Sequence, residues 1–245
     1  MDEYPRYEPY DPIQLAKITE GLVCQNSSRK YTDFYCTGVY EGISTGYTVG
    51  CCLRCVFCWV DFSRDFPEKY GRLYTPEEVF ERLVKNARKR GVSKMRISGG
   101  EPTLGKEHLL ALLELVEGTD YLLILETNGV LIGSDADYAH QLARYTKIHV
   151  RVSLKAGTAE GFEERTGAKG ESWELPCEAI SRLGEARVSF HVAAMSDPCL
   201  MPSSERADML HRLKETGYKG YLEEEVCDPY RTSIARLREA GFELF

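Results

Sequence analysis

The stretch Gly50-Cys51-Cys52-Leu53-Arg54-Cys55-Val56-Phe57-Cys58-Trp59 holds four of the nine cysteines of the chain. In a reducing compartment, cysteines clustered this closely favour a metal site over disulfide bonds. The stretch can be interpreted as C-x3-C-x2-C beginning at Cys51, or as C-x2-C-x2-C beginning at Cys52. The second spacing is that of a bacterial ferredoxin, but the fourth cysteine and its proline are missing. In both registers three thiolates converge on one site.

Three thiolates suit an iron–sulfur cluster in which one iron has no protein ligand. An open metal position is typical of a reactive site rather than of a closed structural one, as in zinc proteins. The apolar neighbours Val56, Phe57 and Trp59 are expected to exclude water and to tune the reduction potential. Two other interpretations stay open: buried core thiols on one face of a helix, and a zinc site completed by a distant Cys or His.

The composition is that of a globular protein with a sizeable core. The chain has 245 residues, of which 43% are hydrophobic and 28% charged, and its net charge is −7. This charge gives no support for binding to DNA or to an anionic membrane surface. The start of the chain, residues 1–5, lacks the basic and apolar segments of a signal peptide, and no apolar stretch is long enough to span a bilayer. We expect a cytoplasmic protein.

Strand and helix patterns alternate along the chain. Strands are predicted over residues 43–49, 94–98, 121–126, 148–153, 187–195 and 218–226, and helices over 75–90, 106–117, 135–145, 172–183, 204–216 and 232–240. This alternation indicates a parallel sheet with helices outside it. Six β-α units are too few for a complete eight-fold barrel, so a partial (β/α)6 barrel or a doubly wound sheet is expected over residues 41–245. Residues 1–40 are predicted to form an N-terminal extension.

Cys51, Cys55 and Cys58 together resemble the cluster motif of the radical S-adenosylmethionine (SAM) superfamily, with Phe57 in the aromatic place before the last cysteine. A second stretch, Ser98-Gly99-Gly100-Glu101-Pro102, follows a predicted strand and resembles the GGE motif of that superfamily. The resemblance implies a 4Fe-4S cluster on the three cysteines.

The resemblance also implies a fold and an activity. The fold is a full or partial (β/α) barrel with its site at the carboxyl ends of the strands, which favours the partial barrel. Gly99, Gly100 and Glu101 would contact the methionyl amino group of SAM. An external electron donor of the flavodoxin or ferredoxin type would reduce the cluster. SAM would then yield a 5′-deoxyadenosyl radical that abstracts hydrogen from a substrate, which makes the protein an oxidoreductase.

Further candidate residues lie on the later strands. Arg151, Ser153 and Lys155 share one face of a predicted strand at period two. By analogy with related enzymes, Ser153 and Lys155 are predicted to contact the carboxylate and ribose of SAM; the alternative is that they face solvent. His191 is either a ligand-binding or a packed core residue. Glu223–Glu225 either bind a cationic substrate group or are solvated.

The substrate stays open between a small molecule, a protein and an RNA. The compact length and Ser153-Leu154-Lys155 resemble glycyl-radical-enzyme activases, although an acid usually stands at Ser153 in these. Cys55–Trp59 resembles wyosine-forming tRNA enzymes. The Glu126–Gly129 strand end resembles 7-carboxy-7-deazaguanine synthases, in which an Asp replaces Trp59. An alternative of another class is a zinc- or cluster-stabilised binding module. A second cluster would use the remaining cysteines: Cys24, Cys36, Cys177, Cys199 and Cys227.

Overall fold

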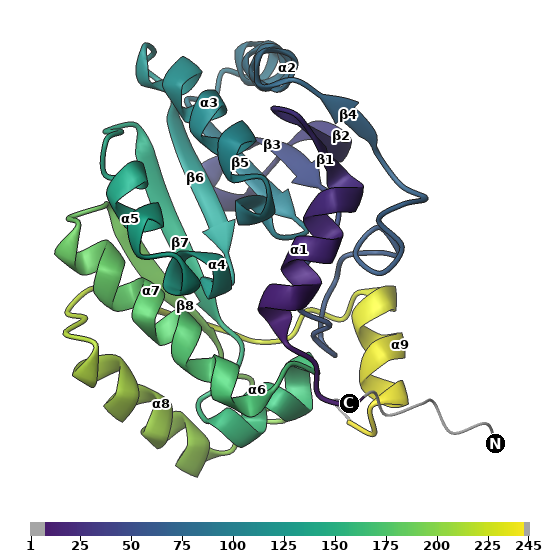
Figure 1. Cartoon of the computed structure of the whole chain (residues 1–245), viewed down its shortest axis with the longest axis vertical. Helices are drawn as coiled ribbons and strands as arrows, with labels where there is room; N and C mark the ends of the chain where they lie inside the picture. The colour runs from purple at the N-terminus through teal and green to yellow at the C-terminus, as the bar shows by residue number, and fades with distance from the viewer. Residues whose placement is uncertain (1–7, 243–245) are drawn as a thin grey trace.

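The computed structural model describes residues 8–242, which fold around one curved, mostly parallel sheet (Figure 1). The strand order is β1-β2-β3-β5-β6-β7-β8-β9, and β4 (Arg72–Tyr74) pairs with β2. The six parallel strands are β3 (Ile43–Thr48), β5 (Lys94–Gly99), β6 (Leu122–Thr127), β7 (Ile148–Leu154), β8 (Phe190–Met195) and β9 (Leu222–Glu225). The first and last strands do not pair, so the barrel is open. The predicted partial barrel of six β-α units is confirmed.

Helices that follow these strands cover the outer face of the sheet (Figure 1). They are α2 (Pro76–Arg90), α3 (Lys106–Glu117), α4 (Val130–Ser134), α5 (Ala136–Leu142), α6 (Ala159–Thr166), α7 (Glu174–Glu185) and α8 (Ser203–Glu215). Local capping explains the starts of two of them: Thr75 and Glu78 form a capping box at α2, and Thr158 accepts a hydrogen bond from the backbone of Gly161 at α6. The short helices α4 and α6 were not predicted, because a helix of two turns gives little periodicity.

The N-terminal part of the chain is more regular than expected. α1 (Pro12–Val23), β1 (Cys24–Gln25) and β2 (Ser28–Thr37) precede the parallel strands, and β2 pairs antiparallel with β3. The extension therefore continues the sheet beyond its first parallel strand. The boundary at residue 40 stays a prediction, and residues 1–7 lie outside the described part.

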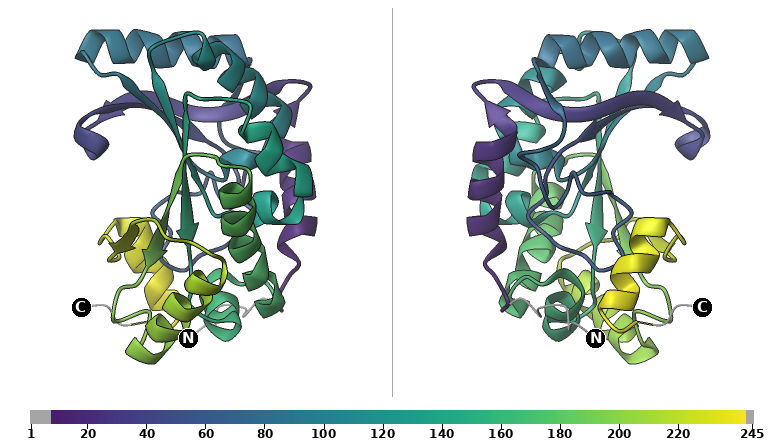
Figure 2. Two further views of the ribbon diagram at one scale, coloured as in Figure 1. Left: turned by 90° about the vertical axis from the view of Figure 1, so that its left-hand side faces the viewer. Right: turned by 90° about the vertical axis from the view of Figure 1, so that its right-hand side faces the viewer.

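The last helix, α9 (Arg231–Glu239), stands apart from the outer helices. The side views show α1 and α9 on opposite flanks of the molecule (Figure 2). The side chain of Thr232 in α9 donates a hydrogen bond to the carbonyl oxygen of Trp59 at 2.7 Å, which places this helix beside the cysteine segment.

A buried histidine in α3 joins the N-terminal part of the chain to the barrel. The His108 ring lies 2.7 Å from the Ser27 carbonyl oxygen through Nδ1 and 2.9 Å from the Tyr31 hydroxyl through Nε2. Since a carbonyl only accepts, Nδ1 carries the proton of a neutral ring, and Nε2 accepts from the tyrosine. Burial is the main cause that lowers the pKa of His108 to about 4.

This lowered pKa predicts a loss of stability in mild acid. Between pH 6.5 and 4 the unfolded chain binds a proton at His108 that the folded chain does not, so stability falls as the pH falls. We expect this histidine to cost about 2 kcal/mol of unfolding free energy between pH 7 and pH 5. Urea denaturation at both pH values measures the change in unfolding free energy. His108→Gln should remove the part of this change that the histidine causes, whereas His211→Gln, at an exposed position, should retain it. An equal change of unfolding free energy with pH in the two variants would contradict the assignment of this change to His108.

Candidate functional site

The cysteine segment follows β3 as a loop and contains no helix. The three cysteines are therefore not presented on one helical face. The Cys51 sulfur accepts a hydrogen bond from the backbone of Leu53 at 3.4 Å, and the backbone N–H of Cys58 donates to the Cys55 carbonyl at 3.2 Å. Burial is the main cause that raises the pKa of Cys55 to about 12, and the charges of Cys58 and Cys51 add to the rise. Cys51, Cys55 and Cys58 thus lie together on one irregular loop.

Two elements outside the loop hold its backbone. The N–H groups of Arg54 and Val56 donate to the carbonyl oxygens of Thr166 and Arg165, at 3.0 and 2.9 Å. Both carbonyls belong to the last turn of α6, where carbonyls have no partner within the helix. α6 therefore fixes the middle of the cysteine loop.

The glycine turn after β5 lies directly against the start of the cysteine loop. The N–H of Glu101 donates to the carbonyl of Gly50 at 2.8 Å, and that of Gly100 to Thr48 at 2.9 Å. A Cβ on Gly100 would stand 2.0 Å from the Gly50 oxygen, and Gly99 has a φ of +95°. Neither position tolerates a side chain, so the two motifs found in the sequence form one unit.

The Glu101 carboxylate is buried and accepts hydrogen bonds from its own chain. Its donors are the N–H and the hydroxyl of Thr103 (3.1 and 2.6 Å), the Thr127 hydroxyl (2.7 Å) and the Asn128 N–H (2.8 Å). The Asn128 amide in turn points at the Cys52 sulfur, at 3.3 Å, and at the Cys51 sulfur, at 3.8 Å. Glu101 therefore ties the end of β6 to the cysteine loop, and its contact with SAM stays a prediction.

Ser153 and Lys155, at the end of β7, face the cysteine loop. The Lys155 ammonium donates to the Ser153 hydroxyl at 2.7 Å, and its charge acts to lower the pKa of Cys55 against the effect of burial. Ser153 is buried and Lys155 half-buried, so neither is a freely solvated strand end. Phe57 is also buried, among the core residues. The residues predicted from the cysteine loop, β5 and β7 are thus brought together.

His191 lies further from the cysteines, in a charged network on the inner face of the sheet. Its Nε2 is 3.0 Å from a Glu223 carboxylate oxygen, and its Nδ1 is 2.7 Å from His149 Nε2. Arg151 lies 2.8 Å from Glu223 and 2.6 Å from Glu225. Two of the three consecutive glutamates of β9 thus face the barrel interior.

A second charged group on the inner face was missed in the sequence. Glu126 accepts hydrogen bonds from Arg96 (3.1 Å), the Ser98 hydroxyl (2.6 Å) and the Tyr40 hydroxyl (2.8 Å). Burial alone would raise the pKa of Glu126, but Arg96 and Ser98 hold it below the usual value. Arg96 and Ser98 alternate with apolar residues in β5, and this alternation was the available indication that they share a face.

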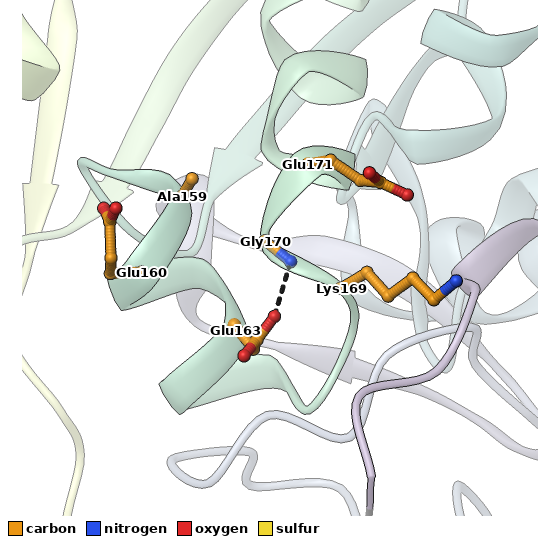
Figure 3. Close-up of a pocket in the computed structure, with 6 residues that line it drawn as sticks. All are labelled: Ala159, Glu160, Glu163, Lys169, Gly170 and Glu171. Atoms are coloured by element: carbon orange, nitrogen blue, oxygen red, sulfur yellow. Dashed lines mark hydrogen bonds between the residues drawn. The ribbon is translucent and has the colours of Figure 1, made fainter.

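A cavity of about 210 Å³ opens beside the glycine turn. It is lined by aromatic, polar and acidic residues from β2, β3 and the loop after Cys58, namely Thr32, Asp33, Tyr35, Tyr47, Thr48, Trp59, Val60, Asp61, Ser63 and Gly99. A second hollow, of about 450 Å³, lies at the surface between α6 and the following turn (Figure 3). None of the residues predicted for the site lines the second hollow, so the smaller cavity is the one that belongs to the site.

Within residues 8–242, no three His, Cys, Asp or Glu side chains converge as closely as a single metal ion requires. Cys199 is exposed and Cys177 is buried in α7. Over the same residues, none of the helices combines the length and apolarity needed to cross a bilayer.

Comparison with known proteins identifies a family. A family model described as the radical SAM superfamily matches residues 46–196. The chain is 31% identical over 148 residues to the probable GTP 3′,8-cyclase of Thermoplasma volcanium, a match that covers 60% of this chain and 43% of that protein. The chain therefore spans less than half the length of this curated relative.

Solved structures share the fold. SuiB of Streptococcus suis bound to the precursor peptide SuiA aligns with a TM-score of 0.62 at 18% identity, over 81% of this chain and 44% of that chain. SuiB bound to S-adenosylmethionine aligns with a TM-score of 0.59 at 19% identity, over 79% and 44%. TYW1 with a lysine-pyruvate adduct aligns with a TM-score of 0.56 at 18% identity, over 77% and 66%.

The buried Glu101 network gives a stability prediction. Replacing Glu101 with Gln exchanges one carboxylate oxygen for an NH2 group, which donates and does not accept. The buried donors that face this oxygen then lose their acceptor. We expect the variant to lose about 3 kcal/mol of unfolding free energy in urea denaturation. Glu81→Gln, on the exposed face of α2, is the matched control and should change stability little. A Glu101→Gln effect no larger than that of the control would show that the network does not hold the turn.

Proposed function

This chain belongs to the radical SAM superfamily, whose members use a 4Fe-4S cluster and SAM, and on that premise we propose that Cys51, Cys55 and Cys58 hold the cluster. The observation that carries the proposal is the hydrogen bond from Glu101 to Gly50, which joins the cysteine loop to the glycine turn. Both lie at the carboxyl ends of parallel strands, the edge at which barrel enzymes place their sites.

The donor set fits such a cluster. Each cysteine of a cubane cluster binds a different iron, so the three sulfurs need not meet at one point. Val56 and Phe57 pack with the hydrophobic core, which shields the site from water. Cys52 is fully buried and next to Asn128, so the register that begins at Cys51 is the one we propose. When bound, the cluster supplies the electron for reductive cleavage of SAM.

The remaining site residues bind and orient SAM in this proposal. The ammonium of Lys155, directly after β7, acts on Cys55 through its charge and pairs with the SAM carboxylate. The Ser153 hydroxyl, 2.7 Å from it, hydrogen-bonds the ribose or the same carboxylate. The Gly99–Glu101 turn receives the amino group in this proposal through the carbonyls of Gly99 or Gly100, because the carboxylate and the carbonyl of Glu101 already accept hydrogen bonds within the chain. A flavodoxin or ferredoxin provides the electron.

The inner face of the sheet favours a polar substrate. Arg96 and Glu126 on one side, and Arg151 and Glu223 on the other, offer charged partners within the barrel. A small molecule rich in hydrogen-bonding groups suits this face better than an apolar one. His191 lies in this network and is assigned to the substrate side.

A second candidate is a guanine nucleotide as substrate, as in the relative named GTP 3′,8-cyclase. The 31% identity over 148 residues favours it. Incubation of the reduced protein with SAM and GTP, followed by mass spectrometry, tests it. Consumption of GTP that requires SAM supports this substrate, and intact GTP beside released 5′-deoxyadenosine excludes it. Activation of a glycyl-radical enzyme and modification of a tRNA base remain further hypotheses that use the same site.

The cluster assignment predicts a loss of function in one cysteine variant. Anaerobically reconstituted protein should bind about four irons per chain and release 5′-deoxyadenosine from SAM under dithionite. Cys55→Ala removes one ligand, and we expect it to bind little iron and release no 5′-deoxyadenosine. Cys199→Ser, at an exposed position, is the control and should behave as the wild type.

The same assay tests the register and the number of clusters. Cys52→Ser should keep the cluster, whereas Cys51→Ser should lose it. The opposite result would move the first ligand to Cys52. Undiminished release from Cys55→Ala would refute the ligand set, and about eight irons per chain would require a second cluster.

The proposed role of Lys155 predicts weaker SAM binding without loss of the cluster. Replacing Lys155 with Met removes one charge-assisted hydrogen bond, and we expect the Kd for SAM to rise about tenfold. Equilibrium dialysis of the reconstituted protein with labelled SAM measures the Kd, and iron content shows that the cluster is intact. Lys214→Met, on the exposed face of α8, should leave the Kd unchanged. An unchanged Kd in Lys155→Met would place the SAM carboxylate elsewhere.

A further inference from the structure

One carboxylate, Asp65, gathers three arginines from different parts of the chain. Its Oδ1 lies 2.7 Å from Nη2 of Arg64 and 3.6 Å from Nε of Arg54. Its Oδ2 lies 2.7 Å from Nη2 of Arg236, which comes from α9. Asp65 lies seven residues after Cys58, on the loop that follows the cysteine segment. We call these four residues the arginine clamp.

Each arginine of the clamp donates to the carbonyl of a different proposed cluster ligand. Nη1 of Arg54 donates to the Cys51 carbonyl at 2.8 Å, and Nη1 of Arg64 to the Cys55 carbonyl at 2.7 Å. Nη1 of Arg236 donates to the Cys58 carbonyl at 2.7 Å. Each guanidinium thus serves one cysteine, although Arg54 lies within the motif, Arg64 shortly after it and Arg236 far beyond it.

The clamp also places positive charge around the cysteine loop. Three guanidinium groups and one carboxylate leave the group net positive. Arg64 is buried, and its guanidinium is charged because arginine is not deprotonated in proteins. Positive charge beside thiolate ligands stabilises the more negative, reduced form of a cluster.

We propose that Asp65, Arg54, Arg64 and Arg236 are positioning residues that hold the three cysteine carbonyls in place and raise the reduction potential of the cluster. The inference rests on the proposed function for the nature of the group that the cysteines bind. The geometric part does not, because the hydrogen bonds to the carbonyls exist within the chain itself. Helix α9 thereby becomes part of the site: Arg236 fixes Cys58, and Thr232 fixes the carbonyl of Trp59.

The first test uses the protein without cluster, under reducing and anaerobic conditions. Iodoacetamide labels free thiols, and mass spectrometry of peptides gives the rate at each cysteine. Arg236→Gln should raise the rate at Cys58 about tenfold, the effect of losing a hydrogen bond from a charged donor. Arg54→Gln should raise it chiefly at Cys51. Cys177, buried in α7, reports global unfolding and should keep its rate.

The second test measures the midpoint potential of the reconstituted protein by EPR-monitored titration. Arg64→Gln removes a buried positive charge and should shift the potential to more negative values. Arg236→Lys keeps the charge but cannot span both Asp65 and the Cys58 carbonyl. It should therefore retain the potential and lose the protection of Cys58. Asp65→Asn should expose all three cysteines to labelling, since it releases all three arginines.

The control is Arg206→Gln, which breaks an exposed pair with Glu224 at 2.6 Å and has no contact with the cysteine loop. This variant should change neither the labelling rates of the cysteines nor the midpoint potential. Labelling that rises equally at every cysteine in a single arginine variant, or that does not rise in any variant, would overturn the clamp, as would a midpoint potential that does not depend on Arg64. If the wild type bound no cluster, the proposed function would fail, and the labelling test would still decide whether the clamp positions the cysteines.

Discussion

The hydrogen bond from the Glu101 N–H to the Gly50 carbonyl is the contact on which the site depends. It closes the distance between two segments that lie about fifty residues apart and follow neighbouring parallel strands. The contact is possible only because Gly100 has no side chain, since a Cβ there would stand 2.0 Å from the Gly50 oxygen. Without it, the cysteine loop and the glycine turn would be two separate strand ends.

A loop without regular structure must have its backbone groups satisfied by other parts of the protein. The cysteine loop shows this from end to end. Arg29, fully buried in β2, donates to the carbonyls of Val49 and Glu101, at 3.2 and 2.9 Å. The last turn of α6 and the guanidinium of Arg236 hold the middle and the end. Both the N-terminal strand β2, which lies outside the β-α repeat, and the helix α9, which ends the repeat, therefore support the loop.

The sequence predicted the repeat better than the parts that support it. Strands such as β3 and β7 and helices such as α2 carry their own periodicity and caps, so their positions could be predicted to within a few residues. The role of residues 8–37 could not, because β2 is a largely polar antiparallel strand whose one deeply buried cation, Arg29, is identifiable only from its distant partners. The cysteine motif was found by its spacing, and the resemblance to a known family selected its register and identified the glycine motif.

What spacing could not reveal is which charges meet across the barrel. Arg96, Glu126, Arg151 and Glu223 come from four strands, and each separately is typical of a solvated surface. Buried charges are expensive unless they are paired, so an inner face built from ion pairs costs more than the apolar packing found on the outer face. A chain that keeps such pairs on one face of a sheet gains nothing from them in stability alone. The pairs therefore support the proposal that a polar molecule enters the open barrel beside the cysteine loop.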